Sequence, residues 1–180
     1  IPGQFQLAFE FVNGYAQAQQ KGKWGLINKQ GQWVVAPEYQ QVTDLHNGLI
    51  GYNQAYGEPW GFLDAQGRPK LSPRWNKTRG FREGMAAIRN KEDLWGFIDT
   101  EGAEVIVPSW TDAKFFSEGL AAVEQDYNYW GYIDTNGHMA IDYQFDQAGP
   151  FVNGFARVAT TTAYGVIDRN GNWIWKKSIY

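Results

Sequence analysis

The sequence predicts an all-β fold, built as a tandem array of five copies of about 35 residues each. The first observation is a Trp-Gly pair that returns with steps of 36, 35, 35 and 34 residues, the last time as Tyr-Gly. The second is a Gly seven residues after the aromatic residue of each pair, and the third is an apolar residue, mostly aromatic, fifteen residues after it. The pairs are Trp24-Gly25, Trp60-Gly61, Trp95-Gly96, Trp130-Gly131 and Tyr164-Gly165.

The copies follow one another without a Ser/Pro-rich linker or a run of charge. We therefore predict a single domain over residues 1–180. Its approximate copies are residues 5–38, 39–74, 75–109, 110–144 and 145–180.

Each copy is predicted to be a three-stranded meander, as its fourth example illustrates. A strand over residues 119–124 leads to a polar hairpin tip at 125–129, and a second strand over 130–133 leads to a turn and a third strand near 138–141. The turn is Asp134-x-x-Gly137, in which the Asp side chain accepts from the turn backbone and Gly supplies the left-handed conformation. The Pro-x-aromatic segment that follows is expected to be the connector to the next copy.

The second strand is predicted to be buried on both faces. Trp95 and Phe97 point one way and Ile98 the other, so both faces of this strand carry apolar side chains. Gly96 then marks a place where another backbone or ring approaches too closely for a Cβ. The ten Trp-Gly and Tyr-Gly residues are accordingly interpreted as structural.

These residues resemble a known family. Trp-Gly, the Asp/Asn-x-x-Gly turn, Pro-x-aromatic and Phe-x-x-Gly together look like the bacterial WG repeat, also called the KWG repeat, and Lys23-Trp24-Gly25 keeps the Lys. The resemblance covers all five copies, and Tyr164, Tyr143 and Lys177 depart from its pattern in the last two. It implies a bacterial β-repeat module without a catalytic motif.

Two arrangements of the copies fit this pattern, an open β-solenoid or superhelix and a five-bladed propeller-like ring. A propeller ring often closes with a strand borrowed from the other terminus, but here Phe5 and Ile179 occupy the same position of the repeat. A copy of 35 residues is also short for a four-stranded blade, which takes about 40 to 45 residues. The open array is therefore the favoured prediction.

Composition restricts the function further. The net charge of −3 is dispersed, which gives no electrostatic case for nucleic acid, and no apolar run is long enough to span a membrane. The chain lacks Cys, so it has neither disulfides nor thiolate metal sites. The lack of a long apolar run predicts a soluble chain. The sequence begins without Met, so it is either a processed mature protein or an excised part of a longer one, and a processed bacterial protein would be exported to the periplasm or beyond.

Residue types that often carry chemistry are explained here by turns. The row Asp64, Asp99, Asp134 and Asp168 resembles a calcium ladder, but the turns already require these side chains, and Asn28 takes the same position. His46 and His138 lie at unrelated positions. Glu83 and Glu118 share a turn position with Asn13, Asn47 and Asn153, which favours a capping role over a glycosidase pair. We expect no metal, no cofactor and no enzymatic activity.

The hairpin tips are the predicted binding edge, because they alone differ in length between copies and insertions in repeat proteins often map to the binding face. The edge is acidic and bears Tyr side chains. Its candidate residues are Tyr52, Tyr56, Glu58, Glu92, Asp93, Asp126, Tyr127 and Tyr129. Trp33, Trp173 and Trp175 are further aromatic residues that the repeat does not explain, and the first two join the candidate list.

The leading functional prediction is a non-catalytic module that binds another protein, with a basic partner favoured by the acids. An inhibitor or immunity protein is one concrete form. The alternative is a carbohydrate or peptidoglycan binder that stacks sugars on exposed aromatic rings, and a hydrolase is third.

Overall fold

The protein is a chain of five small antiparallel sheets. The computed structural model describes residues 4–126 and 128–179, and within them it has twenty strands in five four-stranded meanders. The first two sheets are β1 (Leu7–Ala8), β2 (Tyr15–Gln20), β3 (Lys23–Asn28), β4 (Trp33–Tyr39) and β5 (Gln41–Val42), β6 (Leu49–Asn53), β7 (Trp60–Asp64), β8 (Pro69–Trp75). The third and fourth are β9 (Lys77–Arg82), β10 (Met85–Arg89), β11 (Trp95–Ile98), β12 (Glu104–Trp110) and β13 (Asp112–Ala113), β14 (Ala121–Glu124), β15 (Trp130–Ile133), β16 (Met139–Phe145). The fifth is β17 (Gln147–Val152), β18 (Phe155–Thr160), β19 (Ala163–Ile167), β20 (Trp173–Ser178).

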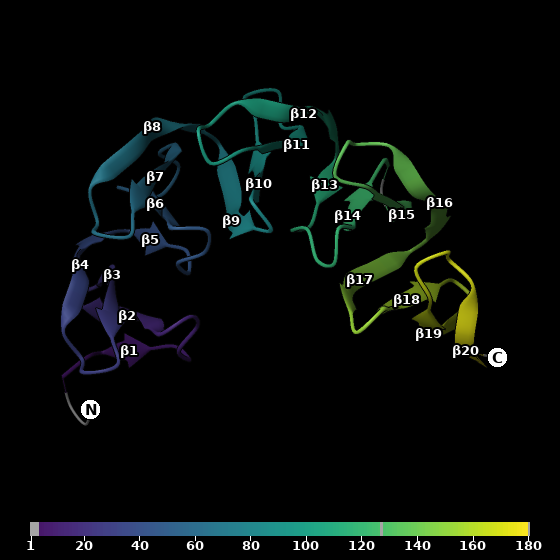
Figure 1. Ribbon diagram of the computed structural model, residues 1–180, viewed down its shortest axis with the longest axis horizontal. Coiled ribbons are helices and arrows are strands. Elements are labelled where there is room, and N and C mark those ends of the chain that lie inside the picture. Colours follow the sequence, from purple (N-terminus) through teal and green to yellow (C-terminus); the bar gives the residue numbers. More distant parts are fainter. Residues whose placement is uncertain (1–3, 127, 180) are drawn as a thin grey trace.

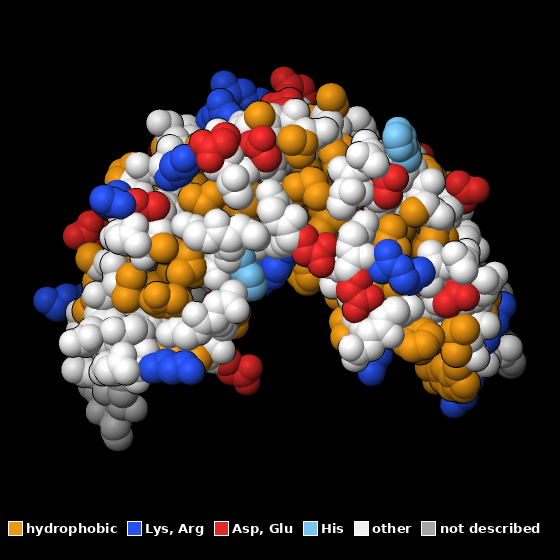
Figure 2. All heavy atoms as spheres, in the orientation of Figure 1, with side chains coloured by type: hydrophobic (Ala, Val, Ile, Leu, Met, Phe, Trp, Pro, Cys, Tyr) orange, Lys and Arg blue, Asp and Glu red, His pale blue; other side chains and the backbone are white. Residues whose placement is uncertain are grey.

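The sheets follow one another around an arc (Figure 1). The first strand of each sheet faces the inside of the arc and the fourth forms its outer rim. The first and last sheets stand apart at the two ends, and the space-filling view shows the same crescent (Figure 2). The all-β prediction and the open array are confirmed, and the closed five-bladed ring is not formed.

The strand count per copy differs from the prediction. Each sheet has four strands among the described residues instead of three, because the expected connector continues into the first strand of the next sheet. After Tyr39, for example, a single intervening residue separates β4 from β5, and the Gln40 amide already donates to the Asn53 carbonyl at 3.0 Å. β5 and β13 have only two residues each, too few for an alternating pattern to show.

The Asp/Asn-x-x-Gly turns form as predicted. Asp99 Oδ1 accepts from the amides of Glu101 and Ala103, each at 2.9 Å, and Gly102 has a φ of 83°. Asn28 Oδ1 does the same without a charge, accepting from Gln30 and Gln32 at 3.0 Å. Backbone hydrogen bonds lower the pKa of Asp64, Asp134 and Asp168, with the amide four residues ahead as the largest cause.

The third strand of each sheet carries the core between sheets. Phe97 and Ile98 are fully buried on opposite faces of β11, which confirms the two-sided burial. Phe97 packs on Phe116 of the next sheet at 4.7 Å between ring centroids. A Cβ on Gly96 would lie 2.6 Å from both Ile106 O and Pro108 N, so the closely approaching backbone is that of β12 in the same sheet.

A second link joins successive sheets at the turn between their first and second strands. The residue before the turn Gly has a positive φ, and its side chain reaches forward to the next sheet. Glu83 accepts from the amides of Glu118 and Gly119 at 2.6 and 2.8 Å, and Glu118 accepts from Gly154 at 2.8 Å. Asn47 accepts from the Gly84 amide at 3.2 Å. These side chains cap turns as predicted, but the turn belongs to the neighbouring copy.

Candidate binding surface at the hairpin tips

The tips between the second and third strands define one edge of the molecule. In every meander the loop from the second to the third strand lies at the same end of the strands as the connection to the next sheet. The tips therefore line one side of the arc. We call residues 54–59, 90–94 and 125–129 the tip edge. It carries four acidic side chains and one Lys, so its charge is negative.

The predicted aromatic residues of this edge separate into two groups. Tyr56 is 79% exposed and Tyr129 is 49% exposed. Tyr52 is only 6% exposed and packs on Tyr39 at 4.9 Å, so it is a core residue and is not available to a partner. Tyr127 lies outside the described residues.

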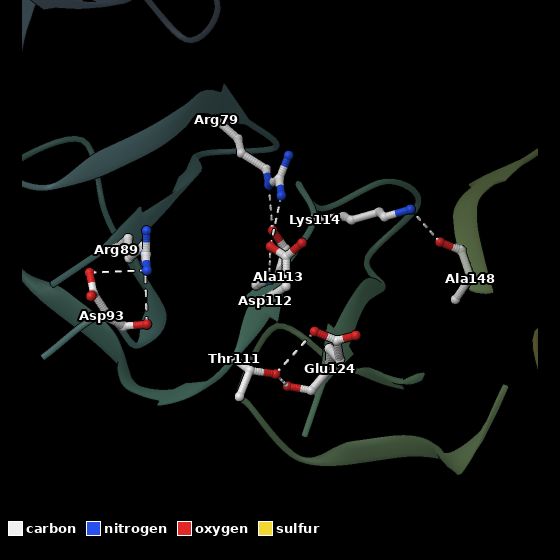
Figure 3. Close-up of polar contacts among 9 residues, drawn as sticks. All are labelled: Arg79, Arg89, Asp93, Thr111, Asp112, Ala113, Lys114, Glu124 and Ala148. Carbon is white, nitrogen blue, oxygen red and sulfur yellow. Dashed lines mark hydrogen bonds and ion pairs between the residues drawn. The ribbon is translucent and has the colours of Figure 1, made fainter. Parts of the chain in front are cut away.

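The predicted acids also differ in what they do. Glu58, Glu92 and Asp126 are exposed. Asp93 has a φ of 63°, and its carboxylate contacts Arg89 at 3.1 Å and accepts from Asn76 Nδ2 at 3.3 Å (Figure 3 draws the Arg89 contact). Asp93 therefore shapes its tip, and the other three leave their charge to solvent.

Tyr143 turns the fourth tip into an ordered platform. It stands where the first three copies have Pro, and its ring stacks on Tyr129 at 5.4 Å with an interplanar angle of 24°. The Tyr143 hydroxyl donates to Gln125 Oε1 at 3.1 Å and accepts from Trp110 Nε1 at 2.8 Å. This departure from the repeat therefore holds an exposed Tyr in place. The sequence shows the substitution, but its contact with the tip depends on the fold.

Glu124 braces the same tip from the strand side. Its Oε1 accepts from the Asn128 amide at 2.8 Å, and its Oε2 accepts from Thr111 Oγ1 at 3.1 Å (Figure 3 shows the Thr111 contact). Asn128 has a φ of 59°, so this carboxylate helps to hold a left-handed residue. Both sides of the fourth tip are thus fixed by side-chain contacts.

The two predicted Trp residues lie away from the tips. Trp33 and Trp173 begin the outer strands β4 and β20, at the opposite strand ends. Trp33 packs edge-on against Phe5 at 5.2 Å, and Trp173 against Phe145 at 6.2 Å. Both are half-buried. Because they lie at the opposite strand ends, the structure does not bring them together with the tip edge.

The residues of the repeat motif are mostly inside, as expected. Trp95 and Trp130 are buried and Trp24 and Trp60 are half-buried, whereas Tyr164 is 43% exposed. Tyr164 is therefore not a core ring, unlike Trp95 and Trp130 at the same position of the repeat.

Two basic residues, one in the inner strand β9 and one directly after the inner strand β13, were not predicted. Arg79 lies over Trp95 at 4.8 Å and donates to Ala113 O and Asp112 Oδ1, each at 2.7 Å. Lys114 lies over Trp130 at 5.0 Å and donates to Ala148 O at 2.7 Å (Figure 3). Burial, with Arg79 nearby, lowers the pKa of Lys114. Each cation covers the Trp ring of its own copy and hydrogen-bonds to the next copy. In the sequence, the only sign of this role is that Arg79 and Lys114 lie at equal distances after Trp75 and Trp110.

In the described part of the chain, no three His, Asp or Glu side chains are grouped as metal ligands. The same residues include no helix that is long and apolar enough to cross a membrane.

Solved structures with a similar fold are β-propeller-like. Hsv2 from Kluyveromyces lactis is similar at a TM-score of 0.57 and 10% identity, over 92% of this chain and 59% of that one. BamB from Moraxella catarrhalis gives 0.53 and 10%, over 94% and 59%. The WD40 β-propeller domain of Doa1 gives 0.50 and 12%, over 94% and 67%. The chain thus spans about three fifths of Hsv2 and BamB, and these likenesses show the fold alone.

Comparison of sequences gives the family. No curated protein matches the chain. The model of the WG containing repeat matches residues 1–24, 24–55, 60–93, 95–129 and 130–160. The chain therefore belongs to the WG containing repeat family and holds five tandem copies of the repeat.

Proposed function

We propose that this chain is a non-catalytic binding module that presents its tip edge to another protein with a basic surface. An inhibitor or immunity protein is one form of this function. The observation that carries the proposal is the Tyr129 platform, in which Tyr143 replaces a Pro of the repeat and orders an exposed ring. A ring that is fixed before binding loses little conformational entropy when a partner arrives.

Charge supports a basic partner. Glu58, Glu92 and Asp126 are exposed on the same edge, and complementary charges steer a partner toward a surface and raise its association rate. Glu83 and Glu118 are the acids considered as a glycosidase pair, and both carboxylates accept hydrogen bonds from backbone amides of neighbouring copies. Their use in folding supports a binding role over a hydrolase.

The test compares matched variants in capture of proteins from the native lysate, with identification of what is retained. Y143P restores the residue of the first three copies, so it removes the platform and keeps a residue that the fold accepts. The double variant E92K/D126K reverses two exposed tip charges. E101K reverses one exposed charge in the turn between β11 and β12, at the opposite strand ends, and serves as the control for charge reversal away from the tips.

We expect one partner whose affinity falls at least tenfold in Y143P and E92K/D126K and stays within twofold in E101K. Its binding should weaken with added salt in the wild type and less so in E92K/D126K. Equal capture by all variants would contradict the proposal. Retention on a peptidoglycan or polysaccharide column that is lost in W33A or W173A would favour the carbohydrate alternative.

A further inference from the structure

The two end sheets of the arc expose faces that are buried elsewhere in the array. Phe11, in the first copy, is 45% exposed, whereas the equivalent Leu45, Phe81, Phe116 and Phe151 are at most 8% exposed. On the last sheet, Phe155, Tyr164 and Trp175 are 45%, 43% and 51% exposed. Hydrophobic side chains gather at that end of the arc in Figure 2. Terminal copies of repeat proteins normally need a polar outer face for solubility, so these faces call for an explanation.

Successive sheets within the chain pack through the same contacts each time. A third-strand side chain meets the next sheet's first strand, as in Phe62 on Phe81 at 4.9 Å and Tyr132 on Phe151 at 5.0 Å. A turn side chain accepts from the next turn's Gly amide, as Asn47 does from Gly84. These contacts define what one sheet face requires of its neighbour.

The first and last sheets carry matching halves of this interface. At the positions of the third-strand residue and the turn side chain, the last sheet has Val166 and Asn153. At the positions that receive them, the first sheet has Phe11 and Gly14. The last sheet could therefore meet the first sheet of another chain as successive sheets meet within one chain.

Charge distinguishes this pairing from a generic apolar contact. Gln17 of the first copy donates to Asp44 of the second at 2.7 Å. The position of Gln17 holds Gly51, Ala87 and Ala122 in the next three copies and Arg157 in the last, where the side chain is exposed. The position of Asp44 is Glu10 in the first copy, also exposed. The two end faces thus place opposite charges where an interface within the chain places a hydrogen bond.

The last sheet also has room for an incoming side chain. A hollow of about 560 Å³ is lined by Arg157, Tyr164, Val166 and Trp175, among others. A second hollow of about 470 Å³ adjoins it and includes Val152, Phe155 and Arg157. Position 149 is Gly where the third and fourth copies have Arg79 and Lys114 over their rings, and this absence of a side chain helps to open the first hollow.

We propose that a second copy of this chain docks its first sheet on the last sheet of the first copy, head to tail. Phe11 of the incoming chain lies on Val166, and Glu10 pairs with Arg157. Trp175 stands where Val35, Leu71, Ile106 and Ile141 stand in the other copies, so its larger ring displaces the incoming outer rim from the spacing found within the chain. A head-to-tail contact of this kind leaves one unused face at each end, so assembly continues until a ring closes or a filament grows.

A charge exchange tests the pairing in solution. Sedimentation velocity of the wild type should show species larger than one chain that increase with concentration. R157E and E10R alone should each stay monomeric, because each meets a like charge. An equal mixture of the two should recover association through the pairs that the mixture makes complementary. A wild type that is monomeric at every concentration, or single variants that assemble like the wild type, would overturn the proposal.

Cross-linking gives a second readout, which the lack of native Cys makes specific. Mixing E10C with R157C under mild oxidation should give a disulfide-linked dimer. The control mixture of E10C with E58C, whose Cys lies at the tip edge, should give at least tenfold less cross-linked dimer in the same time. Equal cross-linking of both mixtures would refute head-to-tail docking. The proposal would also be overturned if the wild type did not assemble but bound a sugar polymer, and W175A did not bind it. The exposed face of the last sheet would then be a glycan-binding face.

Discussion

Replacement of Gly96 by Ala tests how closely the third and fourth strands of a sheet approach. Gly96 is not among the positive-φ residues, so the change imposes no left-handed strain and its cost is steric. The new Cβ would lie 2.6 Å from Ile106 O and Pro108 N, well inside ordinary contact. Both atoms belong to the backbone of β12, which cannot rotate away as a side chain does. β12 must shift, and its contacts with the fourth sheet shift with it.

The magnitude follows from two opposing effects. Overpacking of a filled site costs about 1–3 kcal/mol, and displacement of backbone places this site in the upper half of that range. The reduced entropy of the unfolded chain returns about 0.4–1 kcal/mol for Gly to Ala. We expect a net loss of about 2 kcal/mol in the free energy of unfolding, measured by urea denaturation, and a fall in Tm of about 4–8 °C.

The matched control is Gly51→Ala. A Cβ on Gly51 would lie 3.0 Å from the Cγ2 atoms of Thr43 and Thr78, which are side-chain atoms able to move. The third and fourth copies already have Ala at this position, as Ala87 and Ala122. G51A should therefore change the unfolding free energy by less than about 1 kcal/mol. If G51A destabilises the protein as much as G96A, the reasoning about backbone approach is refuted.

Three further predictions concern the array. Trp95→Ala, at a buried ring, should cost about 3–5 kcal/mol in urea denaturation, and Tyr164→Ala, at an exposed ring, should cost clearly less; equal costs would contradict the burial difference. Glu83→Ala should cost about 1–2 kcal/mol in the same assay through the lost amide contacts and the positive φ, and Glu83→Asn should recover part of it, since Asn47 fills the same role. Asp134 has a folded-state pKa below its ordinary value of 3.8, so its contribution to stability is present above about pH 4 and is lost as the pH falls through the folded-state pKa. Stability curves against pH should therefore be flatter below pH 4 for Asp134→Asn, and an unchanged slope would argue against this contribution.

The periodic features of the fold could be predicted because they are repeated five times. The adjacent apolar residues Phe97 and Ile98 predict burial on both faces of their strand, and Asp99 and Gly102 predict the turn. The first strand of each sheet was missed because three of the five, β1, β5 and β13, are only two residues long, too short for a pattern of side chains to mark them.

The binding edge was harder to predict because a tip boundary depends on strand register. Tyr52 looked like a tip residue, but it pairs with Gly61 inside the hairpin, and the loop begins after Asn53. Tyr143 was visible only as a loss of Pro, since its stacking on Tyr129 is a tertiary contact. Tyr164 is exposed in the last sheet, where Gly149 stands at the position of the cations that cover Trp95 and Trp130.

The forward-reaching turn side chains also bear on how such an array changes length during evolution. Glu83, Glu118 and Asn47 each accept from main-chain amides of the next copy, and every residue except proline offers such an amide. The bond therefore places almost no demand on the neighbour's side chains. A gene duplication that inserts or removes a whole copy keeps these junctions intact without a compensating substitution, so the number of copies can drift while each junction persists.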